Sequence, residues 1–207
     1  GIPPGDITAG QMELVAELAD QYSQGELRTT HNQNLLLADV KQADLFKVWQ
    51  ALENQGLATA NIGTLTDMIC CPGLDFCALA NAQSISVAKQ VSAKFSEMDY
   101  LYDLGELSLN LSGCINACGH HHIGNIGLLG VDKKGEQWYQ ITLGGSSEND
   151  ATIGQVIGKS VPIDAVADSL EKILTVYVDE RLEGEPFVEA YHRIGKQKFK
   201  DTLYADN

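Results

Sequence analysis

The sequence predicts an α+β fold in which helices pack against one face of a sheet. Amphipathic helical stretches alternate with short extended segments through the first 56 residues, a density typical of this class. A hairpin pattern lies at 126–143, and a long amphipathic stretch covers 163–178. With 207 residues, of which 44% are hydrophobic and 20% charged, the chain has ample material for one large domain or two small ones.

The N-terminal segment begins with a helix. Thr8 and Gln11 have the spacing of a capping box, and apolar residues then recur at helical spacing from Met12. Gly25 offers the C-terminal stop of this helix. The segments that follow are predicted, in order, to be extended at 27–30, extended at 35–40, and helical at 45–52 up to Gly56.

The middle and the end of the chain alternate in the same way. Apolar residues between Leu79 and Phe95 form a helical stripe, and alternation over 107–112 predicts a half-buried strand that delivers Gly113 and Cys114 at its end. The later elements are a hairpin of 126–131 and 137–143 around a turn at 132–135, and a helix over 163–178 with Pro162 in its first turn.

Two pairs of cysteines carry the strongest chemical signal. Cys71 and Cys77 are spaced C-x5-C, Cys114 and Cys118 are spaced C-x3-C, and 36 residues separate the pairs. A 4Fe–4S cluster is held by four thiolates, one on each iron. Glycines at 73, 113 and 119 allow backbone N–H groups to approach sulfur closely, where a Cβ would obstruct them. The spacing therefore favours an iron–sulfur cluster.

Other interpretations of the cysteines are weaker. Structural zinc prefers shorter spacings than C-x5-C, and five cysteines are too few for a disulfide scaffold and leave one thiol unpaired. Separate buried cysteines, each acting as a small hydrophobic residue, are the remaining alternative. Cys70 in place of Cys71 would give C-x6-C, so Cys70 is taken as a spare thiol in the interior.

Several motifs together resemble the siroheme-dependent sulfite and nitrite reductases. The chain contains C-x5-C, then Gly-Cys-x-Asn-x-Cys-Gly at 113–119, then Leu-Gly-Gly about 25 residues further on. The segment Arg28–Leu35 is similar to the family's Arg-(Leu/Ile)-Thr-x-x-Gln-Asn-Leu, and the tail over 183–200 is similar to the bacterial assimilatory sulfite reductase hemoprotein. The resemblance covers essentially the whole chain.

The resemblance implies a particular domain organisation. Enzymes of this family contain two fused repeats, and the chain is similar to the second, C-terminal one. Half of a ferredoxin-like domain is expected at 1–60, an α/β domain for the 4Fe–4S cluster and siroheme at 61–160, and a closing C-terminal helix with a basic tail at 161–207. The first helix starts with no strand before it, so we expect the sequence to be a fragment of a longer chain.

The resemblance also implies roles for individual residues. Cys71, Cys77, Cys114 and Cys118 would hold the four irons, and Cys118 would also be the axial ligand of siroheme iron.

Four polar residues are candidate siroheme contacts: Asn32, Gln33, Asn116 and His120. Turn formation explains the asparagines and the glutamine about as well, and His120 stands where relatives often carry Arg. The adjacent residues of the run His120–His122 point to alternate sides of an extended chain, which argues against a separate histidine-bound metal.

The expected activity is six-electron reduction of sulfite, with nitrite as the alternative substrate. The family takes its substrate-binding Arg and Lys residues mainly from the first repeat, so the fragment alone is expected to be inactive and could lack siroheme. An electron-transfer module that carries only the cluster, and a cofactor-free folded fragment, are the alternatives. Expected partners are the N-terminal repeat, a flavoprotein or ferredoxin electron donor, and sulfite or nitrite.

Charge and hydropathy limit the other partners. The formal charge of −14 argues against nucleic acid, and no apolar run approaches 18 residues. Neither a membrane nor a signal peptide is expected, so a cytoplasmic location is the default. Four basic residues gather in the tail and could dock an acidic electron donor or form a solvated helix face: Arg193, Lys196, Lys198 and Lys200.

Overall fold

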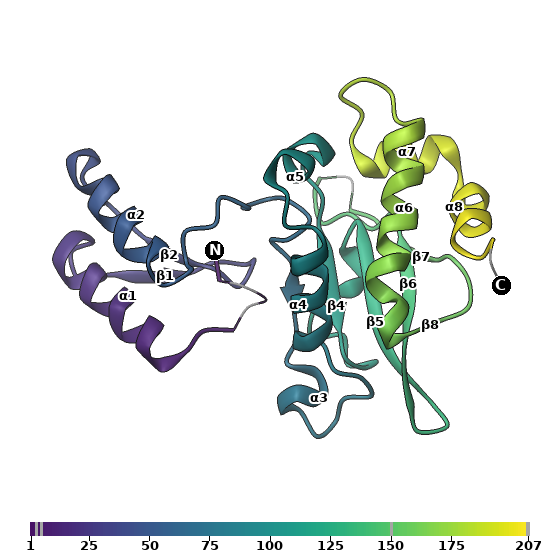
Figure 1. Cartoon of the computed structure of the whole chain (residues 1–207), viewed down its shortest axis with the longest axis horizontal. Helices are drawn as coiled ribbons and strands as arrows, with labels where there is room; N and C mark the ends of the chain where they lie inside the picture. The colour runs from purple at the N-terminus through teal and green to yellow at the C-terminus, as the bar shows by residue number, and fades with distance from the viewer. Residues whose placement is uncertain (3, 5, 150, 206–207) are drawn as a thin grey trace.

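A computed structural model of the chain describes residues 1–2, 4, 6–149 and 151–205. The N-terminal part lies to one side of the larger part in Figure 1. Its elements are α1 (Ala9–Tyr22), β1 (Leu27–Thr29), β2 (Leu35–Leu37), the 3₁₀ helix η2 (Gln42–Asp44) and α2 (Leu45–Glu53). β1 and β2 pair antiparallel, with Leu27 opposite Leu37.

The predicted capping box is confirmed at the start of α1. The backbone N–H of Gln11 donates to Oγ1 of Thr8 at 3.3 Å, and the N–H of Thr8 donates to Oε1 of Gln11 at 2.9 Å. Two of the otherwise unpaired donors at this helix end are thereby satisfied. Gly25 follows the helix with φ of +72°, and its N–H donates to the carbonyl of Ala19 at 2.9 Å.

The larger part is built on a six-stranded sheet of order β3-β4-β5-β6-β7, with β8 also paired to β6. β3 and β4 are parallel, as are β4 and β5, whereas β5 and β6 form the antiparallel hairpin that the sequence predicts. The strands are β3 (Ile69–Cys70), β4 (Leu109–Ser112), β5 (Ile126–Lys133), β6 (Glu136–Leu143), β7 (Gln155–Val156) and β8 (Val161–Pro162).

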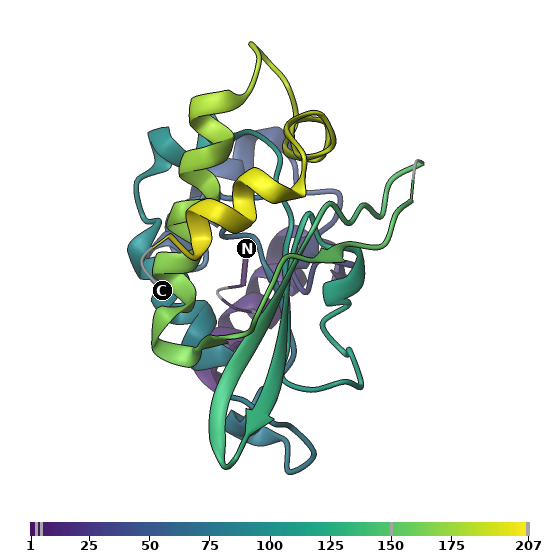
Figure 2. The ribbon, with the colours of Figure 1, turned by 90° about the vertical axis from the view of Figure 1, so that its right-hand side faces the viewer.

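Helices cover one face of this sheet. In Figures 1 and 2, α4 and α6 lie together on that face, and the turn of 3₁₀ helix η3 lies on the opposite side. The helical elements are α3 (Gly73–Phe76), α4 (Ile85–Lys94), α5 (Met98–Leu104), η3 (His121–Ile123), η4 (Ile163–Ala165), α6 (Val166–Glu180), α7 (Phe187–Ile194) and α8 (Lys196–Leu203).

One hydrophobic core joins the sheet to the helices. It includes apolar residues of β4 to β6, of α4 and of α6 to α8. The tail after residue 160 therefore packs into the same core as the strands. The boundaries expected at 60/61 and 160/161 stay predictions.

Two local predictions were wrong. β4 is buried on both faces instead of one, with all four residues buried, because helices cover one face of the sheet and the chain around Gly119 and His120 crosses β4. The helical stripe predicted from Leu79 begins only at Ile85. Before that point the N–H groups of Asn81 and Ala82 donate to the carbonyl of Gly113, at 2.8 and 3.1 Å, so the chain is held in a loop.

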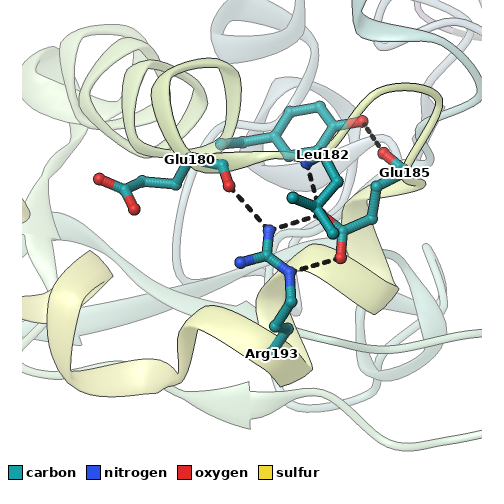
Figure 3. A network of polar contacts seen from close by, with 5 residues as sticks. Glu180, Leu182, Glu185 and Arg193 are labelled. Atoms are coloured by element: carbon teal, nitrogen blue, oxygen red, sulfur yellow. Dashed lines mark hydrogen bonds and ion pairs between the residues drawn. The ribbon is translucent and has the colours of Figure 1, made fainter.

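The C-terminal helices are joined by a polar network shown in Figure 3. Nε of Arg193 donates to a carboxylate oxygen of Glu185 at 2.7 Å, and Nη2 donates to the carbonyl of Glu180 at 2.7 Å. The N–H of Leu182 donates to the same Glu185 carboxylate at 2.9 Å. Hydrogen bonding to Arg193, and then to the Leu182 N–H, lowers the pKa of Glu185 to about 2.

Two of the four basic residues of the tail form ion pairs within the chain. Arg193 pairs with Glu185, and Lys198 pairs with Glu180, whereas Lys196 and Lys200 are exposed on α8. Among the described residues, no helix is long and apolar enough to cross a membrane.

Candidate functional site

The parallel pairing of β3 and β4 brings the two cysteine loops to one edge of the sheet. Cys70 lies opposite Leu111 in this pairing, and the N–H of Cys71 donates to the carbonyl of Leu111 at 3.1 Å. Cys71 therefore leaves β3 where Gly113 and Cys114 leave β4. The carboxyl ends of parallel strands share an edge, which places both loops side by side.

The two loops touch through glycine. The N–H of Gly113 donates to Sγ of Cys71 at 3.0 Å. A Cβ on Gly113 would lie 2.8 Å from Cα of Gly73, and a Cβ on Gly73 would lie 2.4 Å from the backbone nitrogen of Ser84. Gly73 also has φ of +56°, a left-handed conformation that glycine adopts without strain. The predicted role of these two glycines in close backbone approach is consistent with this geometry.

The second cysteine loop folds back across β4. A Cβ on Gly119 would lie 1.8 Å from the carbonyl oxygen of Leu111, and the N–H of Gly119 donates to Oγ of Ser112 at 3.1 Å. Ala117 and His120 adopt left-handed φ values of 55° and 52°. These turns direct the chain between Cys114 and β5 around the end of the sheet.

The four cysteines differ in exposure. Cys71 and Cys114 are buried, at 7% and 8% exposed, whereas Cys77 is half-buried and Cys118 is exposed. The N–H of Cys77 donates to the carbonyl of Gly73 at 2.7 Å, which ties Cys77 to the same glycine. Large apolar side chains are exposed in the same loops: Phe76 at 77%, Leu79 at 74% and Ile115 at 83%.

These residues fit an iron–sulfur cluster in their chemistry and in their backbone. All four candidate ligands are thiols, and the sulfur of Cys71 already accepts a backbone N–H. Glycines allow the backbones of the two loops to approach closely where they meet. Within the described part of the chain, no three His, Cys, Asp or Glu side chains could hold a single metal ion. A cube instead binds each thiolate on a different iron, so its ligands lie farther apart than those of one ion.

Three residues of this site were missed by the sequence analysis: Asp75, Ser84 and Tyr139. Oγ of Ser84 lies 3.6 Å from Sγ of Cys71. Oδ2 of Asp75 accepts from the N–H groups of Ser84 and Ile85, at 3.0 and 3.1 Å, at the start of α4. The signal available in the sequence was an acidic residue ahead of a helix, which does not reveal proximity to Cys71.

Gln33 lies against β3 and not in open space. Its Oε1 accepts from the N–H of Cys70 at 2.8 Å, and its Nε2 donates to the carbonyl of Cys70 at 3.1 Å. The amide thereby joins the N-terminal part to the strand that carries the first cysteines. Asn32 is exposed and lines a cavity of about 480 Å³ together with Ser108 and Asn125.

Cys70 is buried, as predicted. Its Sγ donates to the carbonyl of Cys71 at 3.2 Å, and burial raises the pKa of its thiol. A raised pKa keeps this sulfur protonated, and a protonated thiol is a poor metal ligand.

The remaining polar candidates lie in the loop that follows Cys114. Asn116 and His120 are exposed. His121 is buried at 1% exposed, its ring centroid is 3.9 Å from that of His122, and its Nδ1 has no hydrogen-bond partner among the described residues. Burial, and then the neighbouring His122, lower the pKa of His121 to about 4.

Comparison with known protein families identifies both parts of the chain. Residues 1–55 match the nitrite/sulfite reductase ferredoxin-like half domain, and residues 63–206 match the nitrite and sulphite reductase 4Fe-4S domain. The chain belongs to the nitrite and sulfite reductase family. The expected α+β class, with a ferredoxin-like half domain and a domain of the 4Fe-4S type, is thereby confirmed.

Individual relatives agree with this assignment. The chain is 28% identical over 201 residues to sulfite reductase (ferredoxin) 2 of Mycolicibacterium paratuberculosis, covering 91% of this chain and 36% of the relative. It is 30% identical over 199 residues to the chloroplastic ferredoxin–nitrite reductase of Zea mays, covering 89% and 34%. The chain thus spans about a third of the length of these relatives.

Solved structures support the fold. The chain is similar to the Mycobacterium tuberculosis NirA protein with a TM-score of 0.83 and 24% identity, covering 96% of this chain and 38% of that one. It is similar to dissimilatory sulfite reductase I with a TM-score of 0.78 and 13% identity, covering 98% and 67%.

Proposed function

We propose that the chain is the cluster-binding, C-terminal part of a siroheme-dependent sulfite reductase, with nitrite as the alternative substrate. The observation that carries the proposal is the meeting of the two cysteine loops, with Gly113 donating its N–H to the sulfur of Cys71 and packing on Gly73. In this proposal Cys71, Cys77, Cys114 and Cys118 hold a 4Fe–4S cluster.

The exposure of Cys118 supports a second role for its sulfur. Cys118 would also hold siroheme, because a sulfur with that second role needs open space on its outer side and Cys118 is the exposed member of the four. The exposed side chains of Phe76, Leu79 and Ile115 are apolar, as the face of a macrocycle requires. We assign Asn32, Asn116 and His120 to siroheme contacts. Gln33, the fourth candidate, would support the siroheme site indirectly, because its amide is bonded to the backbone of Cys70.

When bound, the two cofactors would carry electrons from an external donor to the oxyanion for its six-electron reduction. The chain's own contribution is to hold the cluster thiolates and to exclude water from Cys71 and Cys114, which are buried. Stabilisation of the substrate anion and of its developing charge needs cationic groups. The loops at 70–84 and 113–125 contain neither Lys nor Arg, so we assign that task to an N-terminal repeat of the same enzyme.

Other partners follow from the relatives. Two of them carry ferredoxin in their names, and a Bacillus licheniformis relative is named as the hemoprotein component of an NADPH-type sulfite reductase. We propose a ferredoxin or flavoprotein as the electron donor here. A cytoplasmic location is part of the proposal, and it is supported by five cysteines that are all free of disulfides.

The same lack of Lys and Arg favours one second candidate. Siroheme carries carboxylates, and these loops offer no fixed cation to bind them. The chain alone could then be an electron-transfer module that holds only the cluster.

A visible absorption spectrum of the purified chain, after anaerobic loading with iron and sulfide and then with siroheme, separates these functions. A broad shoulder alone indicates a cluster without siroheme, and a strong Soret band with a red-region band indicates both cofactors. A colourless chain that takes up no iron would contradict cluster binding. Sulfite and nitrite reduction with a reduced dye should be absent for this chain alone, and turnover would overturn the assignment of substrate binding to another repeat.

A further inference from the structure

The hydroxyl of Ser84 lies at the meeting point of the two cysteine loops. Its Oγ is 3.6 Å from Sγ of Cys71, and a Cβ on either Gly73 or Gly113 would lie 2.5 or 3.0 Å from that same oxygen. Ser84 is completely buried, at 0% exposed. A buried hydroxyl needs a hydrogen-bond partner, and Cys71 is the sulfur within reach.

Neighbouring groups hold Ser84 in this position. Oδ2 of Asp75 accepts from its backbone N–H at 3.0 Å. The O–H of Tyr139, a residue of β6 that is also 0% exposed, donates to the carbonyl of Gln83 at 2.6 Å and lies 3.4 Å from Oγ of Ser84. The N–H of Gln83 donates to Oε1 of Gln137 at 2.8 Å. Residues of α3 and β6 therefore hold the start of α4, and with it the Ser84 hydroxyl, beside the sulfur of Cys71.

The protonation state of Cys71 sets the direction of this contact. A thiol can donate to Ser84 or accept from it, but a metal-bound thiolate can only accept. The Ser84 hydroxyl must then donate to Cys71, beside the N–H of Gly113 at 3.0 Å.

We propose that Ser84 is a positioning residue that donates to the Cys71 thiolate and thereby raises the reduction potential of the cluster, with Tyr139 holding Ser84 in place. The inference rests on the proposed cluster site. Reduction adds negative charge to the cluster and its sulfurs, and a hydrogen bond to a ligand sulfur stabilises the reduced form. The Ser84 hydroxyl adds a second donor at a buried sulfur, where such a bond is strongest.

The test is a dye-mediated redox titration of the iron-loaded full chain, followed by electron paramagnetic resonance of the reduced cluster. Ser84→Ala should shift the potential to a more negative value with unchanged iron content. Tyr139→Phe should shift it in the same direction and by less. Ser86→Ala is the matched control, because Ser86 is two residues further on and its buried Oγ has no hydrogen-bond partner among the described residues. The reduction potential of the cluster in Ser86→Ala should equal that in the parent chain.

The outcomes separate the inference from the function on which it rests. A parent chain that binds no cluster overturns both. If the parent chain binds the cluster and Ser84→Ala has the same reduction potential, the proposed role of Ser84 is wrong. The proposed cluster site is not affected by that result. If Ser84→Ala fails to fold by circular dichroism, Tyr139→Phe decides, and an unchanged potential in that variant overturns the proposal.

Discussion

Gly113 donates its backbone N–H to the sulfur of Cys71 at 3.0 Å across 42 residues of sequence. The contact exists because β3 and β4 are parallel neighbours that end at the same edge. It joins the two cysteine pairs at a point where neither Gly113 nor Gly73 has room for a Cβ.

Replacement of Gly113 by Ala should destabilise the fold and weaken cluster binding. The added methyl group would lie 2.8 Å from both the carbonyl oxygen of Ala82 and Cα of Gly73, so backbone must move. Overpacking of this kind costs about 1–3 kcal/mol. The free energy of unfolding from urea titration measures the effect. Gly10→Ala on α1 is the control, because nothing lies within 4 Å of its Cβ, and it should not destabilise the chain.

Single variants of Cys70, Cys71 and Cys114 should divide these three thiols into two classes. Cys71→Ser and Cys114→Ser should abolish most of the iron bound per chain after anaerobic loading, whereas Cys70→Ser should retain it. The reason is that Cys70 hydrogen-bonds to the carbonyl of Cys71 and its raised pKa disfavours the thiolate. Iron and sulfide analysis provides the measurement. Full iron content in a Cys71→Ser, Cys114→Ser double variant would show that the ligand assignment is wrong.

The side chain of Gln33 should stabilise the contact between the N-terminal part and β3. Its removal in Gln33→Ala leaves the N–H and C=O of Cys70 without their amide partner, at a cost of about 1–3 kcal/mol. Hydrogen exchange at the Cys70 amide should accelerate in this variant. Asn32→Ala changes an exposed neighbouring amide and should leave that exchange rate unchanged.

The Glu185–Arg193 pair should make the stability of the fold depend on pH. The pKa of Glu185 is lowered to about 2, so its stabilising contribution is complete above its ordinary value of 4.5 and is lost as pH falls toward 2. Glu185→Gln should therefore reduce stability at pH 7 and much less at pH 2.5. Urea unfolding midpoints at the two pH values measure this difference.

The control for the pair is Glu183→Gln, which changes an exposed carboxylate on the same loop. Its midpoint should stay close to that of the parent chain at both pH values. An equal loss for Glu185→Gln at pH 7 and pH 2.5 would mean that the ion pair is not the source of the effect.

Local sequence patterns determined much of what was predicted correctly. The capping box at Thr8 and Gln11 and the hairpin of β5 and β6 depend on residues close in sequence, and both are present. The cysteine spacings and the family motifs were sufficient to recognise the family. Such signals can be recognised in a single sequence because each motif consists of residues that are close together in the chain.

Tertiary structure alone decided which groups surround the cysteines. The late start of α4 depends on hydrogen bonds to Gly113, and the full burial of β4 depends on the core helices and on the loop around Gly119 that packs on it. Ser84 lies beside Cys71, and Gln33 binds Cys70 across 37 residues, through contacts between segments that are far apart in the chain. Spacing along the chain identifies the thiols, but the parallel pairing of β3 with β4 determines what each thiol touches.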